Sequence, residues 1–107
     1  MTPTLCALAL LGSPDPFKAE QIDAACESIP WLAEEPCAAV LAVIWWAETG
    51  GTFAYPRAGF GCGVGQVLET PRTPSCRAMR EPVIGLRMAA WVWLRKRAEA
   101  RNMRQSF

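Results

Sequence analysis

The spacing of apolar residues along the chain predicts a protein made mostly of helices. Residues 4–11 are largely apolar and suit a short helix, which ends before the proline-rich break at 14–16. A second helix is expected over 16–26, because Ile22 and Cys26 then fall on one face. The first quarter of the chain should therefore hold two helices joined by a tight turn.

The segment 35–49 has the clearest helix boundaries. Pro36 suits the first helical position, acidic residues lie at the positive N-terminal end, and two glycines follow at 50 and 51. The middle of this segment, 38–47, is apolar all round the helix. We therefore expect it to be buried on most sides, at the centre of the core.

The second half of the chain alternates between irregular and helical patterns. Residues 52–65 are rich in glycine and aromatics, and 70–76 contain two prolines, so neither suits a long helix. A short helix or a hairpin is expected at 65–69, and a last strong helix from Glu81-Pro82 to about Ala100. Three to five helices with little or no sheet, a mainly α fold, are predicted.

Length and composition fit one small domain over residues 1–107. The chain is 51% apolar and 20% charged, and it has no internal repeat or evident linker. The longest apolar run, 38–47, is shorter than the roughly 18 to 20 residues that span a membrane. The apolar residues 5–11 follow no Lys or Arg and precede no clear cleavage site, so no signal peptide is expected.

Charge is divided unevenly between the two halves of the chain. Residues 1–71 carry eight acids and two bases, whereas 72–107 carry two acids and nine bases. The basic C-terminal helix end, 95–107, could meet nucleic acid, an anionic membrane, anionic wall polymers or the acidic half of a neighbouring subunit. The simpler interpretation is a solvated helix end whose cations suit the helix dipole.

Five cysteines and the absence of histidine limit the possible chemistry. The cysteines lie at 6, 26, 37, 62 and 76 without a C-x-x-C pair, so neither a metal site nor a cofactor is expected. A histidine-dependent serine or cysteine triad is excluded as well. The odd number of cysteines fits either reduced thiols or two disulfides with one free thiol.

Glu48 is the first charged residue after the apolar run. On a helix it shares a face with Trp45, Ile44 and Leu41, which precede it by three, four and seven residues. An apolar setting disfavours a charged carboxylate, and a general acid must keep its proton near neutral pH. The alternative is a glutamate at a helix end that reaches solvent or caps nearby loop amides.

Alternate glycines characterise the segment 59–66, Gly-Phe-Gly-Cys-Gly-Val-Gly-Gln. They leave backbone groups open to close approach by a ligand or by another part of the chain. The spacing matches neither the G-x-G-x-x-G dinucleotide fingerprint nor a phosphate-binding P-loop. A turn-rich structural loop is the alternative interpretation.

These features together resemble the superfamily of lytic transglycosylases and goose-type lysozymes. In that superfamily a buried helix ends in Glu-Ser-Gly or similar, and a Gly-Leu-Met-Gln stretch follows about eighteen residues later. Here Glu48-Thr49-Gly50 is followed by Gly63-Val64-Gly65-Gln66, with Gln66 eighteen positions after Glu48. Glu81-Pro82 and the helix that follows are similar to the family's next motif, so the resemblance covers residues 40–94.

The resemblance implies a lysozyme-like helical domain that cleaves peptidoglycan, as a lytic transglycosylase or a lysozyme-type muramidase. Glu48 would protonate the β-1,4 oxygen between N-acetylmuramic acid and N-acetylglucosamine, with help from the sugar's acetamido group. It would then act as a base toward the sugar's 6-hydroxyl or toward water. The substrate-binding residues implied are Gln66, Gly63, Val64, Gly65, Tyr55 and Phe60.

The remaining predictions concern partners and secondary residues. Glu69 is a candidate second acid or base, and the five tryptophans are assigned mainly to the core. The chain lacks the family's late Tyr-Asn motif, so the cleft is expected to be open or completed by another chain. Peptidoglycan strands are the expected partner, and a phage virion, a secretion machine or a homo-oligomer is a larger assembly that could carry the chain. The alternative function is a non-enzymatic assembly or adaptor module whose basic end binds DNA or another subunit.

Overall fold

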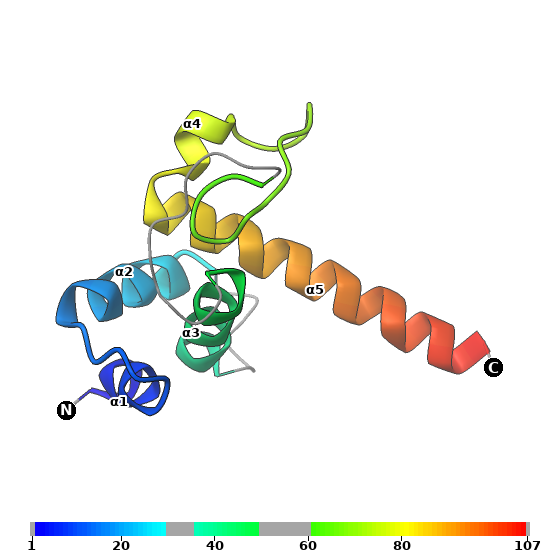
Figure 1. Ribbon diagram of the computed structural model, residues 1–107. Helices are drawn as coiled ribbons and strands as arrows, with labels where there is room; N and C mark the ends of the chain where they lie inside the picture. Colours follow the sequence, from blue (N-terminus) through cyan, green and yellow to red (C-terminus); the bar gives the residue numbers. More distant parts are fainter. Residues whose placement is uncertain (1, 30–35, 50–60, 107) are drawn as a thin grey trace.

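The computed structural model describes residues 2–29, 36–49 and 61–106. These residues form five helices, and their only β-pairing is a single isolated bridge (Figure 1). The prediction of a mainly α fold with three to five helices and little sheet is confirmed. No helix in the described ranges is long and apolar enough to cross a membrane.

Helices α1 (Pro3–Leu10) and α2 (Pro16–Glu27) confirm the two helices predicted near the N-terminus. Each begins with a proline, which suits the first turn because an amide there has no partner within the helix. The preceding residue caps each helix, since the side chains of Thr2 and Asp15 accept backbone amide hydrogen bonds at 3.2 and 2.9 Å. A hydrogen bond from Lys18 and one from a backbone amide lower the pKa of Asp15 below its ordinary 3.8, which keeps this cap charged.

Helix α3 (Cys37–Glu48) was expected to be buried on most sides, and this is wrong. Leu41 and Trp45 are fully buried, but Val43 is 50% and Trp46 is 40% exposed. The helices α1, α2 and α5 that pack against α3 cover one face of it, because so small a domain has few elements to surround a central helix. Helix α3 is therefore half core and half surface.

A tight hairpin follows, in which the backbones of Cys62 and Val67 exchange hydrogen bonds of 2.8 and 3.2 Å. The sequence predicted a short helix or a hairpin over 65–69, and the hairpin observed at 62–67 overlaps that segment only in part. Helix α4 (Cys76–Met79) was not predicted, since one turn leaves no periodic pattern to detect. The hydroxyl of Ser75 accepts the Ala78 amide at 3.1 Å and so caps this turn.

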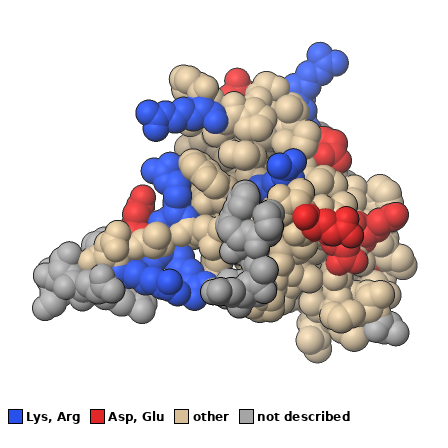
Figure 2. Space-filling view, turned by 180° about the vertical axis from the view of Figure 1, so that it is seen from behind, with Lys and Arg blue, Asp and Glu red and all other residues tan. Residues whose placement is uncertain are grey.

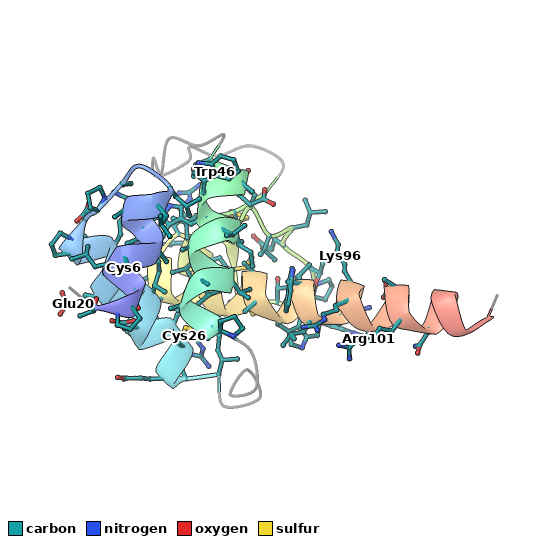
Figure 3. The ribbon with its side chains drawn as sticks, turned by 90° about the horizontal axis from the view of Figure 1, so that it is seen from below. Cys6, Glu20, Cys26, Trp46, Lys96 and Arg101 are labelled. Carbon is teal, nitrogen blue, oxygen red and sulfur yellow. A yellow bond between two sulfur atoms is a disulfide. The ribbon has the colours of Figure 1, made fainter. Side chains whose placement is uncertain are left out.

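The last helix, α5 (Pro82–Ser106), continues beyond the predicted end at Ala100. Its start is fixed by Glu81, whose carboxylate accepts the Ile84 amide at 3.1 Å. It does not stop earlier because residues 101–106 contain neither glycine nor proline to break a helix. Its C-terminal part projects beyond the other helices (Figure 1), and Arg101 lies on this projecting part (Figure 3).

The core joins the first three helices to the beginning of α5. Fully buried large side chains come from all five helices, from the hairpin and from the segment just after α2: Leu8, Ile22, Ile29, Leu41, Trp45, Val64, Met79 and Leu86. Two disulfides reinforce this small core. Cys26–Cys37 ties the end of α2 to the start of α3, and Cys62–Cys76 ties the hairpin to α4, while Cys6 is free and exposed on α1 (Figure 3). Of the two cysteine arrangements left open by the sequence, the structure has two disulfides with one free thiol.

Candidate functional site

The larger of the two grooves described here lies between the end of α3, the hairpin, the segment 68–73 and the middle of α5. Its volume is about 670 Å³, which is within the range of roughly 300 to 1,000 Å³ typical of sites for small ligands. Its walls combine aliphatic and aromatic side chains with a carboxylate, an amide, hydroxyls and cations. Such a mixture suits a ligand that has both apolar faces and polar groups.

Glu48 is the last residue of α3 and lines this groove. The expectation that it would sit in an apolar, buried setting is wrong, because the residue is exposed. Ile44, one turn earlier, is half-buried and lines the same groove. The carboxylate is therefore open to solvent at one side of a partly apolar groove, where a bound ligand could reach it.

Gln66 lies at the end of the hairpin turn and lines the same groove as Glu48. Its backbone has φ +49°, a left-handed conformation that a residue with a Cβ seldom adopts. The turn is held by the carbonyl of Gly63, which accepts hydrogen bonds from the Gln66 backbone amide at 3.2 Å and from its side-chain Nε2 at 3.0 Å. The hairpin thus places Gln66 at the groove and also limits the orientation of its side-chain amide.

The residues just before Gln66 serve mainly to pack the hairpin onto the helices. Val64 is 1% exposed and belongs to the core, and neither it nor Gly63 lines the groove. Gly63 has φ +67°, and a Cβ there would collide with the Met79 carbonyl oxygen. The assignment of Gly63 and Val64 as ligand-binding residues is therefore not supported by their positions.

Gly65 has both a packing role and a place in the groove wall. A Cβ at this position would lie 2.5 Å from the Cβ of Ala89 and 3.0 Å from the carbonyl oxygen of Gly85. The missing side chain lets the hairpin approach α5 closely. Gly65 also lines the groove, so of the three residues before Gln66 it is the one that stays a candidate ligand contact.

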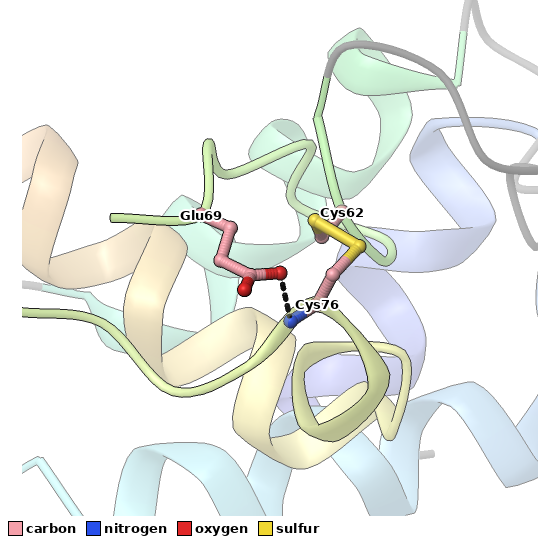
Figure 4. Close-up of side chains that lie close together, drawn as sticks. All are labelled: Cys62, Glu69 and Cys76. Atoms are coloured by element: carbon pink, nitrogen blue, oxygen red, sulfur yellow. Dashed lines mark hydrogen bonds between the residues drawn. A yellow bond between two sulfur atoms is a disulfide. The ribbon is translucent and has the colours of Figure 1, made fainter. Parts of the chain in front are cut away.

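Glu69, the candidate second acid or base, lies outside the set of residues that line the groove. Its carboxylate accepts the backbone amide of Cys76 at 2.7 Å, next to the Cys62–Cys76 disulfide (Figure 4). The oxygen and the two sulfur atoms lie close together, but the sulfurs are bonded to each other and offer no thiolate to a metal. The position of Glu69 is explained by capping the start of α4.

Tyr55 and Phe60, proposed to stack on a sugar, lie outside the described residues. Two tryptophans that the sequence interpretation assigned mainly to the core, Trp91 and Trp93, line the groove. Trp91 is 39% exposed and lines the groove, and the guanidinium carbon of Arg95 lies 5.1 Å from the centre of its ring. The sequence signal for this contact was the four-residue spacing of Trp91 and Arg95, which places them on one face of a helix.

Cations line the groove together with Glu48. Arg72 comes from the segment 68–73, and Arg95 and Lys96 come from α5. Figure 2 shows basic side chains along α5 and over the adjoining part of the molecule, whereas acidic side chains gather mainly on the opposite side. On α2, Glu20, Asp23 and Glu27 line a second groove of about 510 Å³. Acidic and basic residues, which are unevenly divided between the two halves of the sequence, are thus also unevenly distributed over the surface.

The arrangement can therefore offer a ligand one carboxylate, one amide, an exposed indole ring and a cationic wall. The chain matches no protein-family model, no curated protein and no solved structure.

Proposed function

We propose that this protein cleaves the glycan strands of bacterial peptidoglycan, with Glu48 as the acid. The observation that carries the proposal is that Glu48 and Gln66 line one groove. The sequence motifs that hold them resemble those of lytic transglycosylases and goose-type lysozymes. The resemblance requires these two residues, which are eighteen positions apart in the sequence, to lie in one groove.

Glu48 would donate its proton to the glycosidic oxygen between N-acetylmuramic acid and N-acetylglucosamine. In the free protein the residue is exposed. A glycan strand lying in the groove would bring a glycosidic oxygen within reach of this carboxyl group, as proton donation requires. After the bond breaks, the same carboxylate would accept a proton from the sugar's 6-hydroxyl, which leaves an anhydro end, or from water, which leaves a reducing end.

The groove supports a scheme that relies on the substrate's own acetamido group. Glu48 is the only carboxylate among the described residues that line the groove. The other candidate, Glu69, does not line it and accepts a hydrogen bond from the start of α4 instead. Most glycosidases need two carboxylates, whereas substrate-assisted enzymes replace one with the acetamido oxygen. A single acid at the groove is consistent with the second type.

Gln66 and Trp91 would hold the strand in place. The amide of Gln66 can bond polar groups of a sugar, and the indole ring of Trp91 offers an apolar surface for a sugar face. The turn that fixes Gln66 is tied to α4 by the Cys62–Cys76 disulfide. Disulfides are typical of proteins that act outside the reducing cytosol, which supports action at the cell wall or in the periplasm. A phage virion or a secretion machine is the larger assembly that would carry the protein to the wall.

A turbidity assay on purified peptidoglycan tests this proposal. The wild-type protein should clear the suspension, and Glu48→Gln should be slower by about 10² to 10⁴-fold, because it keeps the size of the side chain without a transferable proton. Glu20→Gln is the matched control, since Glu20 is exposed on α2 and lines the other groove. No clearing by folded wild-type protein, or equal clearing by Glu48→Gln, would refute the proposal.

A non-enzymatic assembly or adaptor module is the second candidate, and the projecting part of α5 favours it. Arg101 is exposed there, on the part of the helix that continues past the packed helices (Figure 3), and the sequence places Arg97 and Arg104 close to it. Such a basic arm suits an acidic surface of another subunit or DNA. Binding of DNA that weakens steeply with salt, together with no clearing of peptidoglycan, would favour this candidate.

A further inference from the structure

The cations in the larger groove outnumber its acids. Arg72, Arg95 and Lys96 line it, and Glu48 is the only acid among the described lining residues. The cations come from two separate elements, the segment 68–73 and α5. They are therefore brought together by the fold and do not form one continuous basic run.

These charges are poorly compensated within the protein. Arg95 reaches Glu99 only at 3.9 Å, with side chains 61% and 66% exposed, and such an exposed pair neutralises little charge. Arg72 and Lys96 have no ion-pair partner among the described side chains. The backbone amide of Arg72 donates to the hydroxyl of Thr70 at 3.2 Å, which helps to fix the segment that carries it. The groove thus presents cations that are available to an anionic ligand.

Position separates these cations from those of the projecting arm. Trp91 and Val92 of α5 and Ile44 of α3 line the same groove, so its cations adjoin apolar surface. Charges beside apolar surface interact more strongly with a ligand than charges fully surrounded by water. Arg101, by contrast, does not line the groove. A ligand with both apolar sugar faces and anionic groups would use the groove in preference to the arm.

We propose that the groove selects glycan strands that bear free carboxylates over neutral strands, and that Arg72 and Lys96 make this selection. The inference rests on the proposed cleavage of peptidoglycan, whose N-acetylmuramic acid has a lactyl group that is a free carboxylate wherever the stem peptide is absent. A neutral polymer of N-acetylglucosamine has the same β-1,4 backbone and acetamido groups but no carboxylate. It would contact Gln66 and Trp91 equally well and would leave the cations without a partner.

Nucleic acid fits the groove less well than a carboxylated glycan. Glu48 lies in the same groove and would repel a closely spaced row of phosphates. Carboxylates on a glycan occur on alternate sugars, so they can meet the cations while an uncharged sugar lies beside Glu48.

Binding of chemically matched glycans tests the inference without relying on cleavage. The measurements with glycans use the full chain with Glu48→Gln, so that no ligand is consumed, and the measurement with DNA uses the full chain with Glu48 kept. Calorimetry would compare peptide-free glycan strands, the same strands with methyl-esterified carboxylates, and chitohexaose. The free-acid strands should bind about tenfold more tightly than the esters, as expected for two exposed charge contacts. Added salt should reduce this preference, because it screens exposed charges.

Two further variants assign the preference to the groove. Arg72→Gln with Lys96→Gln should abolish the preference for free acids and leave the binding of chitohexaose unchanged. Arg101→Gln removes one charge outside the groove and should keep the preference. Equal binding of acids and esters would overturn the inference, as would an equal loss in Arg101→Gln. Duplex DNA that competes with the strands and loses affinity in the double variant would identify a nucleic-acid groove, which also contradicts the inference.

The outcomes separate this inference from the proposed cleavage. If the wild-type protein releases no fragments from peptidoglycan but the preference for acids is found, cleavage is refuted and the selectivity of the groove stands. If the wild-type protein cleaves and the acids and esters bind alike, only the selectivity is refuted.

Discussion

Glu48 and Gln66 line the same groove, one at the end of α3 and the other at the end of the hairpin turn. The two positions are held by different interactions. Glu48 follows the buried residues Leu41 and Trp45 of α3, whereas Gln66 depends on a left-handed backbone and on the carbonyl of Gly63. Substitutions that disturb the packing of α3 and substitutions that disturb the hairpin turn should therefore have different effects on the groove.

The backbone and the side chain of Gln66 can be tested separately. Gln66→Asn should fold with nearly wild-type stability, because asparagine tolerates positive φ better than most residues. Its shorter amide would no longer reach the same part of the groove, so we expect clearing of peptidoglycan to fall by about tenfold, the equivalent of one hydrogen bond. Thermal unfolding and turbidity, measured on the same sample, check the two effects. Unchanged clearing would remove Gln66 from the site.

Gly65 should be intolerant of any side chain. Gly65→Ala places a Cβ 2.5 Å from that of Ala89, so either the hairpin or α5 must shift. We expect the free energy of unfolding to drop by about 1 to 3 kcal/mol, as for other overpacked sites. Denaturant titration measures this loss. Combining Gly65→Ala with Ala89→Gly should cost less than the sum of the two single changes, and strict additivity would contradict the contact.

Two tryptophans should respond in opposite ways to truncation. Trp45 is fully buried, so Trp45→Ala should cost about 3 to 5 kcal/mol of stability. Trp91 is 39% exposed in the groove, so Trp91→Ala should leave the protein folded and weaken its binding to peptidoglycan. Cosedimentation with purified peptidoglycan and thermal unfolding distinguish the two effects. Binding by Trp91→Ala that equals wild type would exclude this ring from the site.

The two disulfides should differ in their effect on function. Each closes a short loop and should contribute about 2 to 4 kcal/mol of stability, so replacing either pair by serine should lower the melting temperature. Removing Cys62–Cys76 frees the hairpin that carries Gln66, and we expect clearing to fall at temperatures where the protein is still folded. Removing Cys26–Cys37 leaves the hairpin tied and serves as the control. Equal loss of clearing in both variants would indicate a general effect of stability.

Much of the helical layout could be predicted from the sequence, because helix signals are local. Pro16, Pro36 and Pro82 mark starts of the predicted helices, and the apolar pattern of each helix does not depend on distant residues. The disulfide pairing could not be predicted, since it depends on which turns meet in space. The length of α5 was underestimated because no breaking residue marks its end.

The candidate site was predicted less completely, for physical reasons that differ between residues. The exposure of Glu48 was stated only as the alternative interpretation, because an apolar run does not reveal how many neighbours surround a helix. Val64 looked like part of a binding loop, but it packs into the core, since glycines serve close packing as readily as ligand contact. Trp91 was assigned to the core with the other tryptophans, and its exposure depends on where α5 leaves the other helices.

Mass analysis of the soluble products from purified peptidoglycan tests the central claim most directly. The account predicts that wild-type protein releases disaccharide fragments that end at N-acetylmuramic acid, as anhydro or as reducing ends. Glu48→Gln should release at least about 10²-fold less, and Glu20→Gln should match wild type. Fragments cut at other bonds, no fragments from folded wild-type protein, or equal release by Glu48→Gln would contradict the account.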